Sequence, residues 1–152
     1  MSTVVITGAL GNIGGKLVQH FRGVAGIETV IGLDLHVPSR EHSADFGSSP
    51  GSKIKFVACD LMDWDDRRWR DAVEICDAIV HLAAQNPYPE ASWDDANRSL
   101  EMTMNVGLAA VDARVRRVVF VSSNHVMGRY KDSPLVEGIG TGGLTTSLVH
   151  AV

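Results

Sequence analysis

The segment over residues 4–14 (VVITGALGNIG) constrains the fold of this chain more than any other. A short β-branched run ends at the first of three glycines, Gly8, Gly11 and Gly14, and a helical pattern over residues 12–22 follows directly. In this G-x-x-G-x-x-G spacing, Gly8 permits a tight turn, Gly11 lets a pyrophosphate approach the backbone, and Gly14 lets the helix pack on the strand. The phosphates would lie at the N-terminus of the helix. The alternative is a glycine-rich turn without a ligand.

An acidic residue ends the second expected strand. The apolar run over residues 29–33 is followed by Asp34, at about the distance from the glycines where a dinucleotide-binding fold places its ribose-binding carboxylate. A carboxylate accepts a hydrogen bond from a ribose 2′-hydroxyl and repels a 2′-phosphate, so Asp34 favours NAD over NADP as the cofactor. Arg40 lies close enough in the sequence to keep NADP as a second interpretation.

Charge and cysteine content exclude several classes of protein. A net charge of −4 over 152 residues does not favour a nucleic acid or an anionic membrane as a partner. No apolar run approaches the ~18–20 residues of a membrane span, and no signal peptide is visible, so we expect a cytoplasmic protein. Cys59 and Cys76 are expected to be buried free thiols, and no metal site is expected because neither the cysteines nor the six histidines have metal-ligand spacing.

The rest of the chain alternates between apolar runs and helical patterns. Further strands are expected over residues 53–59, 77–84 and 116–123, and further helices over 61–73 and 93–113. Nearly continuous apolar strands between helices predict a parallel sheet that is buried on both faces. The chain is therefore expected to be an α/β protein with a Rossmann-type, doubly wound parallel sheet of strand order 3-2-1-4-5.

Both later helices carry residues with an expected role. In the first, Asp63 is the expected N-cap, and residues 65–68 (DDRR) form the expected solvated face. The second has apolar residues at helical spacing, which are Leu100, Met104, Leu108 and Val111. Gly107 in the same helix is interpreted as a point of close packing against the sheet.

Ligands of such a sheet bind beyond the carboxyl ends of the strands, where the strand order reverses. The expected cofactor-binding residues at that edge are Gly8, Gly11, Asn12, Ile13, Gly14, Asp34, Asp60, Leu61, Leu82, Ala83 and Ala84. Asp60 would accept a hydrogen bond from an adenine amino group while Leu61 packs on the ring, or Asp60 is a turn or cap residue. The small residues Ala83 and Ala84 would let a dinucleotide lie along the backbone, or they form a tight turn only.

These motifs together resemble the extended short-chain dehydrogenase/reductase family, which includes NAD-dependent sugar epimerases, dehydratases and uronate dehydrogenases. The likeness covers residues 2–135, and the matching segments are 7–14, Asp34, 60–61, 81–84 and 119–123. Residues 122–128 (SSNHVMG) are most similar to the uronate dehydrogenases. The resemblance implies that Ser123 is the catalytic serine, which hydrogen-bonds the reacting oxygen, and that Ser122, Asn124 and His125 bind a carbohydrate substrate. The alternative interpretation of this segment is a polar strand end with Asn124 capping a turn.

The chain departs from the family pattern at two points. Ser99 stands where the long helix of the family usually has an asparagine that faces the site. The family also has a Tyr-x-x-x-Lys pair for proton transfer, whereas the two tyrosines of this chain, Tyr88 and Tyr130, have no lysine four residues later. An unassisted phenol, with a pKa near ~10, is a poor base at neutral pH.

We therefore expect the cofactor-binding part of an oxidoreductase or epimerase that acts on a sugar or sugar acid by hydride transfer. Residues 1–128 would form an NAD-binding Rossmann domain, truncated after the fifth strand, and 129–152 a loop leading to a missing C-terminal part. The alternatives are a non-catalytic dinucleotide-binding or redox-sensing module and a structural domain with an empty turn. The apolar edge of the fifth strand predicts self-association.

Overall fold

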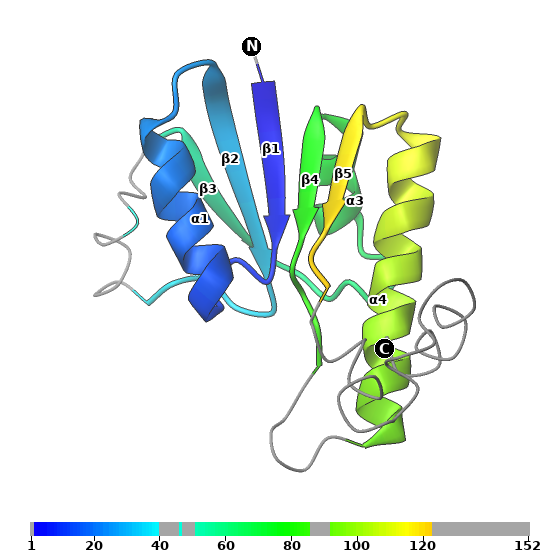
Figure 1. Cartoon of the computed structure of the whole chain (residues 1–152). Coiled ribbons are helices and arrows are strands. Elements are labelled where there is room, and N and C mark those ends of the chain that lie inside the picture. Colours follow the sequence, from blue (N-terminus) through cyan, green and yellow to red (C-terminus); the bar gives the residue numbers. More distant parts are fainter. Residues whose placement is uncertain (1, 40–45, 47–50, 86–91, 123–152) are drawn as a thin grey trace, which may run out of the picture.

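The computed structural model of the chain describes residues 2–39, 46, 51–85 and 92–122 (Figure 1). Strands and helices alternate along them in the order β1 (Ser2–Thr7), α1 (Asn12–Gly23), β2 (Ile27–Asp34), β3 (Ile54–Ala58), α3 (Arg67–Glu74), β4 (Ala78–His81), α4 (Trp93–Asp112) and β5 (Arg117–Phe120). The five strands form one sheet of order β3-β2-β1-β4-β5, and every neighbouring pair is parallel. The predicted Rossmann-type α/β fold and its strand order are confirmed.

Side-chain alternation along β1 gives the sheet two apolar faces. Val4 and Ile6 belong to a buried cluster with Val18 of α1, whereas Val5 belongs to a second cluster with Trp69 of α3 and Val106 of α4. Because successive side chains of a strand point to opposite faces, α1 covers one face and α3 and α4 cover the other. The central strand is therefore buried on both sides, as a doubly wound sheet requires.

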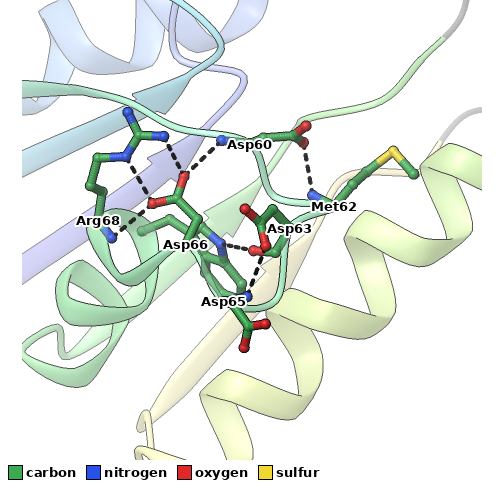
Figure 2. Close-up of polar contacts among 7 residues, drawn as sticks. Asp60, Met62, Asp63, Asp65, Asp66 and Arg68 are labelled. Carbon is green, nitrogen blue, oxygen red and sulfur yellow. Dashed lines mark hydrogen bonds and ion pairs between the residues drawn. The ribbon is translucent and has the colours of Figure 1, made fainter.

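The loop between β3 and α3 differs from the prediction. The helix begins at Arg67, and its N-cap is Asp66, whose Oδ1 accepts a hydrogen bond from the backbone N–H of Arg68 at 3.0 Å. Asp63 instead accepts a hydrogen bond from the N–H of Asp65 within the loop at 3.0 Å (Figure 2). The prediction of Asp63 as the cap is wrong. Two consecutive backbone turns, closed by hydrogen bonds to the carbonyls of Asp60 and Asp63, precede the helix, so that it begins only at Arg67.

Asp66 is also not on a solvated face. It is only 8% exposed, and the guanidinium of Arg68 donates two hydrogen bonds of 2.8 Å to its carboxylate. The hydrogen bond with Arg68 lowers the pKa of Asp66 to about 2. The second carboxylate oxygen accepts a hydrogen bond from the N–H of Asp60 at 3.1 Å, so Asp66 links the helix start to the end of β3 (Figure 2).

An Asp66→Ala variant is expected to lose about 2 kcal/mol of unfolding free energy, because the N–H groups of Arg68 and Asp60 both lose their acceptor. Urea denaturation measures this loss. Asp65→Ala is the matched control, since its side chain is exposed in the same loop and should change stability by less than about 0.5 kcal/mol. Equal stabilities of the two variants would contradict the assigned role of Asp66.

The large apolar residues of α4 are more exposed than the sequence pattern predicts, whereas β5 is exposed as expected for an edge strand. Leu100, Met104, Leu108 and Val111 are 46–74% exposed, and α4 packs through Val106, Ala109 and Ala110. Among the described residues, no atom lies within 4 Å of a Cβ built on Gly107, so the predicted close packing there is wrong. β5 is exposed along its whole length because it pairs on one side only, with β4, in the described part of the chain. The open apolar edge that the sequence analysis expects at the fifth strand is therefore present.

The two cysteines are free, with Cys59 buried and Cys76 half-buried. Within the described residues, no helix has the length and apolar character needed to cross a membrane.

Candidate functional site

A cavity of about 380 Å³ lies beyond the carboxyl ends of the strands. Its walls come from the glycine turn after β1, residues 33–35 at the end of β2, residues 59 and 61 after β3, residues 82–85 after β4, and Met102 of α4. The volume is in the range of small-molecule binding sites. Because the strand order reverses between β1 and β4, the cavity lies where doubly wound sheets bind their ligands.

Two of the three glycines of the turn are required by its geometry. Gly8 has a φ of +64°, and a Cβ there would lie 3.0 Å from the backbone nitrogen of Ala83. A Cβ on Gly14 would lie 2.1 Å from the carbonyl oxygen of Gly8. The expected tight turn at Gly8 and the expected close packing of the helix at Gly14 are therefore both present.

The N-terminus of α1 is open toward an anion. Its N-cap is Gly11, which has no side chain to accept a hydrogen bond, and the first turn contains no acidic residue. The first N–H groups of a helix and its positive dipole end favour a negatively charged group at this position. Gly11 lines the cavity, whereas Asn12, Ile13 and Gly14 follow it in the first turn of the helix and are not among the lining residues.

Asp34 lines the cavity and is held by backbone groups. Its Oδ2 accepts a hydrogen bond from the N–H of Leu10 at 2.9 Å, and its Oδ1 accepts one from the N–H of Leu35 at 2.8 Å. The carboxylate therefore connects the end of β2 to the glycine turn, a contact that the sequence pattern did not reveal. An ionised carboxylate has further lone pairs, so Asp34 can still accept a hydrogen bond from a ligand.

Asp60 and Leu61 lie differently with respect to the cavity. Leu61 is 5% exposed and lines the cavity. Asp60 is exposed and is not a lining residue, and its Oδ1 accepts a hydrogen bond from the N–H of Met62 at 2.9 Å (Figure 2). Asp60 thus has the turn role that was the alternative interpretation, and its contact with adenine stays a prediction.

Asn105 of α4 supports the Leu61 wall and was missed in the sequence. Its side-chain amide donates hydrogen bonds to the carbonyl oxygens of Leu61 at 2.9 Å and Met62 at 3.3 Å. No local pattern identifies this residue, because its partners lie more than 40 positions earlier in the chain.

Side-chain hydroxyls hold both ends of the 82–85 wall. The Oγ1 of Thr7 accepts hydrogen bonds from the N–H groups of Leu82 and Ala83, each at 3.0 Å. At the other end, the Oγ of Ser99 accepts one from the N–H of Gln85 at 2.9 Å and lies 3.1 Å from the Gln85 carbonyl oxygen. Ser99 therefore contacts the backbone of the cavity wall.

The thiol in the cavity is not reactive. Cys59 is 4% exposed, and its burial raises the pKa of the thiol to about 12, so it stays protonated at neutral pH. A protonated thiol is a poor nucleophile and a poor metal ligand. Among the described residues, no group of three potential metal ligands is close enough to hold an ion.

The predicted substrate residues are only partly described by the structure. Ser122 follows β5, is exposed and is not a lining residue of the cavity. The neighbouring N–H of Val121 donates a hydrogen bond to the carbonyl of His81 at 3.1 Å, so the strand pairing continues almost to Ser122. Ser123, Asn124 and His125 lie outside the described residues, and their roles stay predictions.

Comparison with known proteins identifies the family. The sequence model that describes the NAD dependent epimerase/dehydratase family matches residues 4–151, nearly the whole chain. The chain belongs to this family. The resemblance that the motifs indicate is therefore confirmed.

Members of the family with known activities resemble the chain over part of their length. It is 33% identical over 131 residues to the NAD-dependent glucose-6-phosphate dehydrogenase of Haloferax volcanii. The aligned segment covers 84% of this chain and 45% of the relative. The chain is 27% identical over 137 residues to the uronate dehydrogenase of Pseudomonas syringae, and this match covers 88% of the present chain and 44% of the relative. The chain thus spans less than half the length of these curated relatives.

A solved structure with bound NAD is similar in sequence and in fold. This short-chain dehydrogenase/reductase superfamily protein from Agrobacterium tumefaciens is 30% identical to the chain, with a TM-score of 0.62. The match covers 82% of this chain and 33% of the other.

Proposed function

We propose that this chain is the NAD-binding part of an oxidoreductase or epimerase that transfers a hydride to or from a sugar or sugar acid. The observation that carries the proposal is the cavity at the switch point of the sheet, which combines the uncapped N-terminus of α1 with the carboxylate of Asp34. The similarity to an NAD-dependent glucose-6-phosphate dehydrogenase and to a uronate dehydrogenase supports the substrate class. A cytoplasmic location, consistent with two free cysteines, is part of the proposal.

The residues of the cavity fit a dinucleotide in a defined order. The N–H groups in the first turn of α1, from Asn12 to Gly14, would bind the pyrophosphate, and Gly11, whose own N–H donates to the carbonyl of Gly8, would let it approach the backbone. Asp34 would accept a hydrogen bond from a ribose hydroxyl, Leu61 would pack against the adenine ring, with Asp60 beside it, and residues 82–84 would lie along the backbone of the cofactor. Bound NAD supplies the hydride chemistry, whereas the protein supplies orientation and electrostatics.

The substrate would bind beside the end of β5. Ser123 would donate a hydrogen bond to the reacting oxygen of the substrate, and Ser122, Asn124 and His125 would contact the sugar acid. A carbonyl or hydroxyl oxygen polarised in this way gains negative charge more easily in the transition state. These roles rest on the family motif in residues 122–125.

A non-catalytic dinucleotide-binding or redox-sensing module is the second candidate function. The observation that favours it is that neither tyrosine within these 152 residues is followed by a lysine four positions later, since residues 92 and 134 are serine and proline. The formation of NADH with candidate sugar acids would establish the dehydrogenase and contradict the non-catalytic module, because a module without catalysis produces no absorbance change.

Calorimetric titration with NAD and NADP tests the cofactor proposal. The chain is expected to bind NAD more tightly than NADP. In Asp34→Asn the ratio of the NADP dissociation constant to the NAD dissociation constant is expected to fall by about tenfold, because a neutral amide no longer repels a 2′-phosphate. Asp65→Asn is the matched control, since it removes the same charge from an exposed loop. If wild-type protein binds neither nucleotide, the proposed function is wrong.

We also propose that a second copy of the chain covers the exposed edge of the sheet. Val118, Val119 and Phe120 of β5 are 44–52% exposed, and edge strands with apolar side chains associate readily. Light scattering at high concentration should give a mass above 16.4 kDa that falls to the monomer value in Val119→Lys. The control is Asn97→Lys, which adds the same charge to an exposed position of α4. A wild-type monomer contradicts this proposal.

A further inference from the structure

The side chain of His81 is buried beside the cavity without lining it. The residue is 2% exposed, and its ring stacks on that of Phe120 in β5, with the ring centroids 6.0 Å apart. Its Nδ1 lies 2.8 Å from the Oγ1 of Thr7 in β1, and its Nε2 lies 3.1 Å from the Oγ1 of Thr103 in α4. His81 therefore connects three elements that surround β4 (Figure 1).

The surrounding hydrogen bonds determine which nitrogen of the ring carries the proton. The Oγ1 of Thr7 already accepts from the N–H groups of Leu82 and Ala83, so its own proton must be donated to Nδ1 of His81. Nδ1 is then unprotonated, and the proton on Nε2 is donated to Thr103. The hydroxyl of Thr103 in turn donates to the carbonyl oxygen of Ser99 at 2.8 Å. In this series of hydrogen bonds, Thr7 donates to His81, His81 donates to Thr103, and Thr103 donates to the carbonyl of Ser99.

A second proton on His81 would disrupt this arrangement. An N–H at Nδ1 would point at Thr7, whose hydroxyl proton would lose its acceptor and whose oxygen would have three donors. Among the described residues, the groups that face the ring are Thr7 from β1, Thr103 from α4 and Phe120 from β5, and none of them is titratable or charged in this pH range. Burial alone lowers the pKa of His81 to about 4, so the neutral form predominates at neutral pH.

We propose that His81 and Thr103 are positioning residues for the dinucleotide: neutral, Nε2-protonated His81 keeps the hydroxyl of Thr7 turned so that it holds Leu82 and Ala83 in the cavity wall. The role of this wall as a cofactor contact rests on the proposed function. The positioning of the wall rests on the contacts of Thr7, His81 and Thr103 alone. Neither His81 nor Thr103 needs to touch the cofactor.

The test compares Thr103→Val, which removes the hydroxyl at nearly constant shape, with Thr103→Ser, which keeps it. NMR of the ring nitrogens of wild-type protein should show Nδ1 unprotonated and Nε2 protonated. In Thr103→Val the buried Nε2–H would have no acceptor, so the proton should move to Nδ1, where it would compete with the N–H groups of Leu82 and Ala83 for the Oγ1 of Thr7. Amide exchange at Leu82 and Ala83 should therefore accelerate at least tenfold. NAD affinity should fall by about tenfold. Thr103→Ser should restore all three properties.

Each result supports or overturns the proposal. A proton on Nδ1 in the wild-type ring overturns it, and so does a Thr103→Val variant with wild-type amide exchange and NAD affinity. The wild-type spectrum decides the protonation even if Thr103→Val does not fold. If wild-type protein does not bind NAD, the proposed function fails, and the amide exchange of Leu82 and Ala83 still decides whether His81 and Thr103 position this wall.

Discussion

A Gly14→Ala variant is expected to lose about 3 kcal/mol or more of unfolding free energy and to bind no dinucleotide. The added Cβ would lie 2.1 Å from the carbonyl oxygen of Gly8 and 2.9 Å from the Cα of Ala9. These are backbone atoms, so no side-chain rotation relieves the overlap, and α1 must move away from β1. Overpacking of this kind costs ~1–3 kcal/mol and sometimes more. The same movement displaces the helix N-terminus from the cavity.

Urea unfolding and calorimetric titration with NAD measure the two effects. Gly107→Ala is the matched control, since it is the same substitution in α4, where the added Cβ has no atom within 4 Å. It is expected to raise stability by up to about 1 kcal/mol through the better helix propensity of alanine. A Gly14→Ala protein that is as stable as Gly107→Ala would contradict the close packing of α1 on the glycine turn.

Acidification from pH 6.5 to pH 4 is expected to lower the unfolding free energy by about 3 kcal/mol through His81. Burial lowers its pKa in the folded chain from 6.5 to about 4. Between these values the unfolded chain binds a proton that the folded chain does not, so stability decreases as the pH falls. Each unit of pKa shift corresponds to ~1.4 kcal/mol, and the buried position of His81 leaves little solvent screening.

Urea unfolding at a series of pH values measures this dependence. His81→Gln should remove the slope between pH 6.5 and 4, whereas His36→Gln, which changes an exposed histidine, should keep it. Asp66 affects stability in a lower pH range. Its pKa is lowered to about 2, mainly by the hydrogen bond with Arg68. Its contribution to the unfolding free energy is therefore present above pH 3.8 and is lost as the pH falls toward 2. An unchanged slope in His81→Gln would show that His81 is not the buried neutral group.

The strand order and the position of the site could be predicted because they follow from local properties of the residues. Gly8 and Gly14 stand where the backbone needs a positive φ or has no room for a Cβ, and that requirement is visible in their spacing. The alternation of apolar runs with helical patterns is likewise local, and it defines a parallel doubly wound sheet. Asp34 could be identified because it is the last residue of a strand that ends at the cavity.

Contacts between distant segments could be recognised only in the folded chain. Thr7 meets His81 because strands 74 residues apart pair in register, and no periodicity along the sequence encodes that pairing. Asp66 rather than Asp63 caps α3 because the preceding turns bring it to Asp60. The large apolar residues of α4 recur with a helical period, which places them along the same side of the helix. The period does not determine whether that side faces the sheet or the solvent. The small residues Ala109 and Ala110 pack in the core instead, and Leu108 faces outward.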